Sequence, residues 1–322
     1  MIIDFQHHFV PRELAERRGL VPGERRDLME GGIPTFTLHE RLYDLDAQIR
    51  DMDRAGVDVA VLTCNLGWDA PLEECRLIND RLAEIQRRYP GRFVGLAHAP
   101  VLEDEGLSEI DRAVRELGLR GATIASQVGG LALDSPRLGP FYRKACALGL
   151  VIFVHPAQAP AGYAHLREYD LGRILGRELD LELAVTRLIA GGVLEEFPPM
   201  TMVVAHLGGG IAAVKERLVA KSGRFGTLRR PFEEYFGRLY FDLAGFEGGQ
   251  GAVRCALTGI RPERLVFATD YPQDFTGATT QTGAGVEGIA DYIRFVRSLP
   301  VRDGAADAIL GGTAARLLGL EA

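Results

Sequence analysis

The sequence predicts an α/β protein with a (β/α)8 TIM barrel, and three observations lead to this prediction. Eight short apolar runs rich in β-branched residues alternate with segments of helical period almost to the end of the chain. The length of 322 residues suits a barrel with enlarged loops, for which about 250 residues are typical without them. No linker or composition shift divides the chain, so we expect residues 1–322 to form a single domain. A doubly wound open sheet is the alternative.

The expected strands are the short apolar runs, at residues 2–5, 57–63, 93–98, 121–126, 151–155, 202–206, 239–245 and 265–270. Helical spacing is clearest from Leu42 to Met52, where apolar residues recur at steps of three and four. A second clear helix runs from Leu72 to Tyr89 and stops at a Pro-Gly pair. Further helices are expected at 105–117, 136–149, 181–196, 209–220, 249–258 and 286–298.

The extra length of the chain lies in three stretches, residues 19–37, 157–180 and 276–285. Each would follow the carboxyl end of a strand, where the loops of a barrel build the active site. We therefore expect these stretches to form walls or lids of a substrate site. Surface loops without a function are the alternative for each of them.

Composition and charge narrow the class of protein. The chain is 47% hydrophobic and 25% charged, which is ordinary for a globular protein, and its formal net charge of -7 argues against nucleic acid as a partner. The sequence shows no signal-peptide pattern at its N-terminus and no run of about 20 apolar residues, so we expect a cytoplasmic protein that does not span a membrane. The four cysteines lack C-x-x-C spacing, so they predict buried thiols rather than a zinc site.

Polar residues close several of the apolar strands. Gln6 and His8 follow the first, His155 the fifth, His206 the sixth and Asp270 the eighth. One such residue alone is better explained as a buried, hydrogen-bonded side chain. Several at the same end of a barrel are harder to explain in this way, because each costs about 1–3 kcal/mol if it is buried without a partner.

A divalent metal ion would give these groups a common partner. His8 and His155 offer imidazole nitrogens and Asp270 a carboxylate, which leaves a position for water whose pKa the metal lowers. Along an extended strand Gln6 lies on the same face as His8. Either the side-chain carbonyl of Gln6 is a further metal ligand, or the site has lost a ligand at this position. His206 would then act as an acid, a base or a polarising group.

The motifs DFQHHFVP, VIFVHP, MVVAHLGGG, LYFDLAG, LVFATDYP and ILGGTAARLLGL occur in this order over nearly the whole chain. Together they resemble the decarboxylase-type branch of the amidohydrolase superfamily, which includes aminocarboxymuconate semialdehyde decarboxylase and the resorcylate, dihydroxybenzoate and salicylate decarboxylases. The resemblance implies metal ligands at Gln6, His8, His155 and Asp270. It also implies catalytic roles for His206 and for Asp270, the latter as a proton carrier.

The sequence departs from this pattern in ways that bear on the metal. Gln6 stands where histidine or glutamate is usual, and a neutral oxygen ligand favours Mn²⁺ or Mg²⁺ over Zn²⁺. The strand GATIAS lacks the lysine of the two-metal members, so we expect one divalent ion and no organic cofactor. Thr313 replaces an asparagine, a change that we interpret as structural.

Four further residues are candidates for the substrate pocket. Arg41 is the only arginine in IPTFTLHERLYD, the segment that in some of these decarboxylases carries an arginine for the substrate carboxylate, and it is displaced along that segment. Trp68 and Tyr163 follow the second and fifth strands and could stack on a planar substrate, with surface packing as the alternative. His98 ends the third strand and either lines the pocket or is a hydrogen-bonded core residue.

The resemblance implies a metal-dependent nonoxidative decarboxylase, a lyase, that acts on an aromatic or conjugated carboxylic acid. The first alternative keeps the same site and changes the reaction to hydrolysis of a lactone, ester or amide, or to hydration of an alkene. The second alternative is a barrel that binds a small ligand and catalyses nothing. Assembly into a dimer or tetramer is an expectation from the family alone.

Overall fold

The computed structural model describes residues 1–30, 32–162, 164–226, 228–246, 248–273 and 285–320. A three-stranded and a five-stranded parallel sheet form the centre of the molecule in these residues. Their strands are β1 (Ile3–His8), β4 (Val59–Thr63), β5 (Phe93–Gly95), β6 (Gly121–Ala125), β9 (Val151–His155), β10 (Thr201–Val204), β11 (Tyr240–Asp242) and β12 (Leu265–Val266).

The two sheets join at both edges into a closed ring. Parallel bridges connect Ala97 to Ala122, beyond β5, and His7 to Tyr271, beyond β12. The N–H of His8 also donates to the carbonyl of Tyr271 at 2.7 Å. The predicted barrel is therefore confirmed, and the doubly wound open sheet is wrong.

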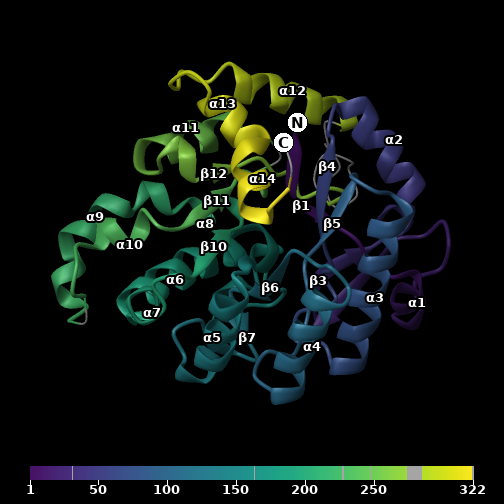
Figure 1. Cartoon of the computed structure of the whole chain (residues 1–322), viewed down its shortest axis with the longest axis horizontal. Coiled ribbons are helices and arrows are strands. Elements are labelled where there is room, and N and C mark those ends of the chain that lie inside the picture. Colours follow the sequence, from purple (N-terminus) through teal and green to yellow (C-terminus); the bar gives the residue numbers. More distant parts are fainter. Residues whose placement is uncertain (31, 163, 227, 247, 274–284, 321–322) are drawn as a thin grey trace.

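Helices surround the ring, as Figure 1 shows. They are α1 (Arg12–Arg17), α2 (Leu45–Ala55), α3 (Leu72–Arg88), α4 (Asp104–Arg115), α5 (Gly139–Leu148), α6 (Arg177–Ala190), α7 (Val193–Glu196), α9 (Lys215–Lys221), α10 (Phe232–Phe236), α11 (Gln250–Gly259), α12 (Gly285–Arg297), α13 (Ala305–Asp307) and α14 (Thr313–Leu318). None of the described helices is both long and apolar enough to cross a membrane.

Helix α2 illustrates how local sequence sets the element boundaries. The side chain of Asp44 accepts a hydrogen bond from the N–H of Ala47 at 2.9 Å and so caps the first turn. Gly56 ends the helix with a φ of 79°, a left-handed conformation that glycine adopts without strain. The predicted helix at this place is confirmed.

Side chains fill the interior of the barrel. The rings of Phe5 and Phe153, from β1 and β9, meet edge to face with centroids 5.7 Å apart. His155 comes two residues after Phe153 and so lies on the same inner face of β9, at its carboxyl end. The carboxyl end of the barrel is thus the place where strand residues can meet a ligand.

Several of the predicted boundaries need correction. Strand β1 runs on to His8 instead of ending at residue 5, whereas β11 and β12 are shorter than expected. The helix expected at 209–220 begins only at Lys215, because Gly208, Gly209 and Gly210 adopt positive φ values of 64°, 72° and 88°. Helix α6 begins at Arg177, inside the stretch 157–180 that we expected to be a loop.

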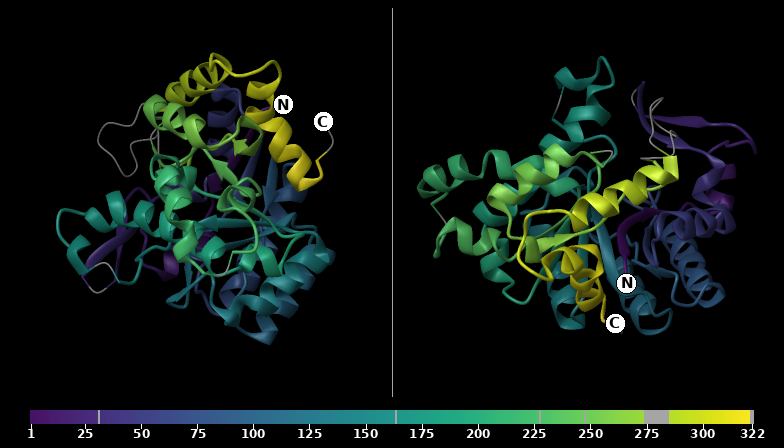
Figure 2. Two further views of the ribbon diagram at one scale, coloured as in Figure 1. Left: turned by 90° about the vertical axis from the view of Figure 1, so that its left-hand side faces the viewer. Right: turned by 90° about the horizontal axis from the view of Figure 1, so that it is seen from above.

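The stretch 19–37 is not a plain loop either. It contains an antiparallel hairpin of β2 (Arg26–Glu30) and β3 (Ile33–Leu38). The end of the stretch 157–180 forms the π-helical turn η4 (Gly172–Gly176) and the start of α6. In the right-hand view of Figure 2, this teal segment and the purple hairpin project from the same side of the molecule. Of the third stretch, 276–285, only Gly285 is described, so the prediction for it falls outside the described residues.

Candidate metal centre and substrate cavity

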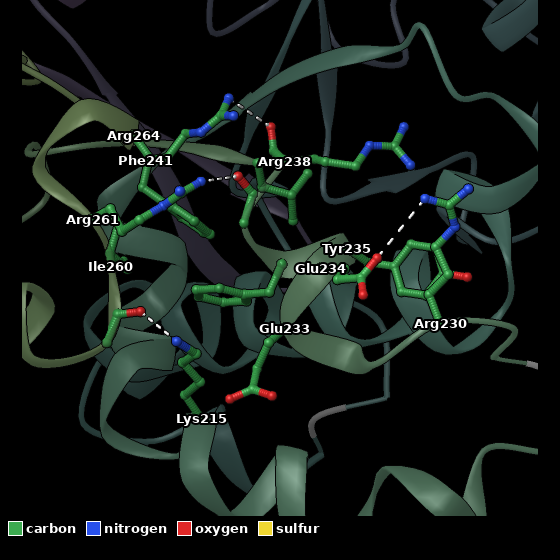
Figure 3. Close-up of a pocket in the computed structure, with 14 residues that line it drawn as sticks. Lys215, Arg230, Glu233, Glu234, Tyr235, Arg238, Phe241, Ile260, Arg261 and Arg264 are labelled. Atoms are coloured by element: carbon green, nitrogen blue, oxygen red, sulfur yellow. Dashed lines mark hydrogen bonds and ion pairs between the residues drawn. The ribbon is translucent and has the colours of Figure 1, made fainter.

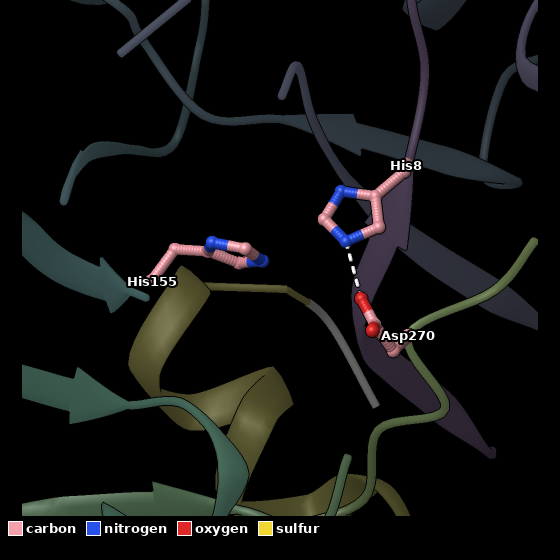
Figure 4. Close-up of side chains that lie close together, drawn as sticks. All are labelled: His8, His155 and Asp270. Atoms are coloured by element: carbon pink, nitrogen blue, oxygen red, sulfur yellow. Dashed lines mark hydrogen bonds and ion pairs between the residues drawn. The ribbon is translucent and has the colours of Figure 1, made fainter. Parts of the chain in front are cut away.

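Three of the predicted ligands come together at the carboxyl end of the barrel. Nitrogen atoms of His8 and His155 and a carboxylate oxygen of Asp270 all lie within 4.8 Å of one another. Figure 4 shows these three side chains together. His8 and His155 are the last residues of β1 and β9, and Asp270 follows β12. Nε2 of His8 lies 2.5 Å from Oδ1 of Asp270.

The hydrogen bonds of His155 leave one ring nitrogen available as a ligand. Its Nδ1–H donates to the carbonyl of Pro156 at 2.9 Å, so Nε2 carries the lone pair. This Nε2 is buried and has no hydrogen-bond partner among the described residues. The indole of Trp68 stacks on the imidazole with a centroid distance of 4.0 Å and fixes the ring. The two imidazoles and the carboxylate therefore fit one divalent metal ion.

Asp270 has an unusual backbone conformation. Its φ is 59°, which few residues other than glycine adopt, and its N–H donates to the carbonyl of Gln6 at 3.0 Å. Burial acts to raise the pKa of Asp270, but the imidazoles of His8 and His206 outweigh it and hold the pKa well below the usual range. The carboxyl group is therefore ionised and able to bind a cation.

Gln6 faces the same carboxylate with its amide nitrogen. Nε2 of Gln6 donates to Oδ1 of Asp270 at 2.6 Å and lies 3.1 Å from Nε2 of His206. Its Oε1 is buried without a hydrogen-bond partner in the described part of the chain. Ligation through the carbonyl oxygen would need the opposite orientation of the amide, so this role stays a prediction.

His206 lies beside the cluster at the start of the left-handed segment α8 (His206–Gly210). Its φ is 53°, and its N–H donates to Asp242 at 2.8 Å. Its ring Nδ1–H donates to Oε1 of Glu178 at 2.8 Å. Burial lowers the pKa of His206, but the charge of Glu178 and this hydrogen bond, together with Asp270, raise it to about 10. Glu178 and Asp270 thus favour the charged, imidazolium form of His206.

Glu178 and Asp242 are site residues that the sequence did not reveal. Burial raises the pKa of Asp242 to about 7. Asp242 is the aspartate of the motif LYFDLAG and the last residue of β11, so it carried the same signal as the other strand-end residues. Glu178 gave no signal, because it stands in a helix of charged and apolar residues. A Cβ atom on Gly209 would lie only 1.9 Å from the carbonyl oxygen of Glu178, so glycine permits the close approach of α6 to α8.

A cavity of about 290 Å³ opens above the cluster. His155, His206 and Asp270 line its base. The hairpin strand β3 contributes a wall that includes Phe36, and η4 and α6 contribute another that includes Arg177. Two of the three extra stretches therefore line this cavity with their described parts.

Comparison with known proteins identifies the family. The sequence profile of the amidohydrolase family matches residues 3–320. The chain belongs to the amidohydrolase family. It is 27% identical over 293 residues to 2-amino-3-carboxymuconate-6-semialdehyde decarboxylase of Dictyostelium discoideum, an alignment that covers 87% of this chain and 77% of the other. It is also 27% identical to gamma-resorcylate decarboxylase of Rhodococcus jostii, over 83% of this chain and 86% of that one.

A solved structure shares the fold of this amidohydrolase. The 5-carboxyvanillate decarboxylase of Novosphingobium aromaticivorans, complexed with manganese and 4-hydroxy-3-methoxy-5-nitrobenzoic acid, superimposes with a TM-score of 0.80. The match covers 99% of this chain and 96% of that chain at 24% sequence identity. The predicted family resemblance is confirmed by these matches.

The structure of this amidohydrolase places two pocket candidates away from the cavity above the cluster. The indole N–H of Trp68 donates to the hydroxyl of Thr123 at 3.1 Å, and its ring packs on His155 as described above, so Trp68 supports a cluster residue and does not line that cavity. Arg41 pairs with Asp51 at 2.7 Å and does not line it either. Tyr163 lies outside the described residues.

His98 is a hydrogen-bonded core residue in this amidohydrolase. Its Nε2 accepts from the N–H of Cys64 at 3.0 Å, and its Nδ1–H donates to the carbonyl of Leu96 at 3.0 Å. Burial lowers the pKa of His98 to about 4, which keeps the ring neutral. Of the two alternatives for His98, the geometry favours the core role.

A larger cavity, of about 650 Å³, lies beside the start of β11 (Figure 3). It is rich in cations, but each one has a partner. Lys215 donates to the carbonyl of Gly259 at 2.7 Å, and Arg261 to the carbonyl of Gly237 at 3.1 Å. None of the residues of the metal-binding cluster lines it.

Proposed function

We propose that this amidohydrolase is a metal-dependent nonoxidative decarboxylase of an aromatic or conjugated carboxylic acid. The observation that carries the proposal is the convergence of His8, His155 and Asp270 at the base of a cavity that His206 also lines. The names of the relatives support it, since decarboxylases are among the most similar curated and solved proteins.

His8, His155 and Asp270 would hold one divalent ion, Mn²⁺, Zn²⁺ or Mg²⁺, with the carbonyl of Gln6 as a further ligand. The manganese in the solved 5-carboxyvanillate decarboxylase supports a metal of this kind. When bound, the ion supplies Lewis-acid stabilisation of negative charge on the substrate. No organic cofactor is needed for this reaction.

The chain's own groups provide the proton that replaces CO₂. Nε2 of His206 lies 4.0 Å from Oδ2 of Asp270, and both residues line the cavity. His206 is charged and keeps its orientation through the hydrogen bond to Glu178, so it is the proton source of the site, and Asp270, which is ionised at rest, would carry this proton only in passing to the substrate. Asp270 then delivers that proton to the substrate carbon. The bond from this carbon to the carboxylate breaks, its electron pair stays on the carbon and takes the proton, and CO₂ leaves.

The walls of the cavity suit a flat substrate. Phe36 and Ile174 line it and present apolar surface, while Asn65 lines it with an Oδ1 that is buried and has no partner among the described residues. A ring could pack on the apolar side chains, and a hydroxyl of the substrate could donate to Asn65. A volume of about 290 Å³ suits a small ligand with one ring.

The test is a substrate panel on protein loaded with Mn²⁺, run in ¹⁸O-labelled water. Hydroxybenzoates and muconate semialdehydes are assayed for CO₂ release, and lactones, esters and amides for cleavage. We expect CO₂ release from at least one acid and no ¹⁸O in the organic product. Cleavage of an ester or lactone with ¹⁸O entering the product, without CO₂ release from any acid, would support the hydrolase alternative instead.

We also propose that residues 1–322 form one domain, in the cytoplasm, that assembles into a dimer or tetramer. The contiguous apolar core supports the single domain. An exposed apolar row on η4 and α6, formed by Leu175, Leu179 and Leu183, supports assembly, since such rows often lie at subunit interfaces. Light scattering after size-exclusion chromatography tests it: a monomer at micromolar concentration would contradict assembly.

A further inference from the structure

Arg177, the first residue of α6, is a cation of the cavity wall that forms no ion pair with a described carboxylate within 4.0 Å. It lines the same cavity as His155, His206 and Asp270. Within the described part of the chain, its Nη2 donates to neutral oxygen atoms: the carbonyl of Thr35, and the carbonyl and side-chain oxygens of Gln158 at 3.2 and 3.0 Å.

The other nitrogen atoms of the Arg177 guanidinium group have no hydrogen-bond partner among the described residues. Nε is buried and has no hydrogen-bond partner, and Nη1 donates to no group in the described part of the chain. No ion pair joins Arg177 to any described carboxylate within 4.0 Å. The nearby acids have other partners: Oε1 of Glu178 accepts from His206, while its Oε2 has no hydrogen-bond partner among the described residues, and Asp270 lies against His8. Burial lowers the pKa of Arg177 to about 10, which still leaves it charged at neutral pH.

The neighbouring Arg173 shows what a neutralised cation looks like in the same wall. Its Nε and Nη2 donate to the carboxylate of Asp170 at 2.8 and 2.7 Å, and its Nη1 lies 3.6 Å from Asp27. Its charge is therefore balanced by two carboxylates before any substrate binds. Arg177, one helical turn further along, keeps an unbalanced charge that faces the cavity.

We propose that Arg177 binds a second acidic group of the substrate, at a distance from the carboxylate that is lost. This inference rests on the proposed function, because it assigns the first carboxylate to the cluster at the base of the cavity. Guanidinium groups bind carboxylates through charge-assisted hydrogen bonds, and these are stronger in a partly desolvated cavity. Arg177 would thus select dicarboxylic acids, or acids with an ionised second substituent, over simple monocarboxylic acids.

The rigid setting of Arg177 favours this role. Its Nη2 is tied to the hairpin through Thr35 and to the loop after β9 through Gln158, so the guanidinium is held in place before the ligand arrives. Arg41, which the sequence suggested for a carboxylate, has its own carboxylate partner in Asp51. We therefore expect a substitution of Arg177 to change ligand binding and a substitution of Arg41 to leave it unchanged.

The experiment measures ligand affinity by calorimetry, with benzoate and with benzene-1,2-, 1,3- and 1,4-dicarboxylate as probes on Mn²⁺-loaded protein. We expect at least one dicarboxylate to bind the unmodified protein about 10- to 100-fold more tightly than benzoate. In Arg177→Gln this preference disappears, and in Arg177→Lys part of it remains. In the control Arg41→Gln the preference is unchanged. Circular dichroism and thermal melting verify that each variant is folded.

Several outcomes would overturn the inference. One is equal affinity of the unmodified protein for benzoate and for all three dicarboxylates, a result that needs no variant. Another is a folded Arg177→Gln protein that keeps the preference, and a third is its loss in Arg41→Gln alone. Because binding is measured without turnover, failure of the decarboxylase proposal has a different signature: no acid releases CO₂, while the dicarboxylate preference and its dependence on Arg177 persist.

Discussion

The two cavities of this protein differ in how their polar atoms are paired. In the smaller cavity, above the cluster, buried polar atoms lack partners among the described residues, among them Nε2 of His155, Oδ1 of Asn65 and Nε of Arg177. In the larger cavity, beside β11, the cations are bound to backbone carbonyls or to a carboxylate. Arg238 donates to the carbonyls of Leu194 at 2.5 Å and Pro198 at 2.7 Å.

This difference teaches that unpaired buried polar groups indicate a functional site better than size does. An unpaired buried polar atom costs about 1–3 kcal/mol, so a fold keeps several of them together only where a ligand pairs them. Among the described residues that line the larger cavity, no buried side-chain nitrogen or oxygen atom lacks a partner. In the proposed function, a metal ion and a substrate would supply the missing partners in the smaller cavity.

The largest effect is expected for Asp270. Asp270→Asn removes the charge and the proton carrier, so decarboxylase activity should fall by about 10²- to 10⁴-fold. Steady-state CO₂ release measures this. The matched control is Glu233→Gln, which removes a carboxylate from the larger cavity and should leave activity within about twofold of the original. Equal losses of activity in both variants would contradict the assignment of catalysis to the smaller cavity.

Glu178 should have an intermediate effect, because it acts through His206. Glu178→Gln replaces the charged acceptor of the imidazole N–H, and we expect kcat to fall by about 10- to 100-fold with a smaller change in KM. Glu182→Gln, one turn further along α6, is the control and should change little. If Glu178→Gln changed KM and left kcat alone, while Glu182→Gln changed neither, Glu178 would serve substrate binding instead of holding His206.

His98 tests the opposite claim, that fully paired polar groups are structural. Because its pKa is about 4 in the folded protein and about 6.5 when unfolded, the unfolded state binds the proton first as the pH falls. Its contribution to stability is present above pH 6.5 and is lost between pH 6.5 and 4, by about 1.4 kcal/mol per pH unit. When unfolding by urea is measured across this pH range, the free energy of unfolding of His98→Gln should fall less steeply with decreasing pH than that of the unmodified protein. Turnover by folded His98→Gln should stay within a few-fold of the original.

The smallest effect is expected in the larger cavity. Arg261→Gln removes the hydrogen bond to the carbonyl of Gly237, which should cost about 0.5–1.5 kcal/mol of unfolding free energy. Activity and metal content should not change measurably. Denaturant unfolding and CO₂ release test the two parts separately, and a large loss of activity in a stable variant would assign a function to this cavity.

Residues at strand ends could be predicted from the sequence because the pattern and the barrel together fix their place. His8, His155 and Asp270 each follow an apolar run, and parallel strands bring such ends together. Arg177 and Glu178 could not be predicted in this way. On a helix, charged residues are normally solvated, and only the packing of α6 against β3 and α8 turns these two toward the cavity.

Two features of the backbone could likewise not be predicted from the sequence. The hairpin of β2 and β3 lacks a strong alternation, since residues 26–30 are mostly exposed, so its sequence resembled a loop. The left-handed glycines after His206 interrupted an apparent helix, because helical spacing does not report a positive φ. The fold class was predictable from the repeated order of elements, whereas the walls of the cavity depend on contacts between distant segments.

The central claim is that His8, His155 and Asp270 hold a metal ion, and elemental analysis of purified protein tests it most directly. We predict about one divalent ion per chain after reconstitution with Mn²⁺, lost in His8→Ala and retained in Arg261→Gln. Protein that holds no metal after reconstitution, or His8→Ala protein that still holds one ion per chain, would contradict the account.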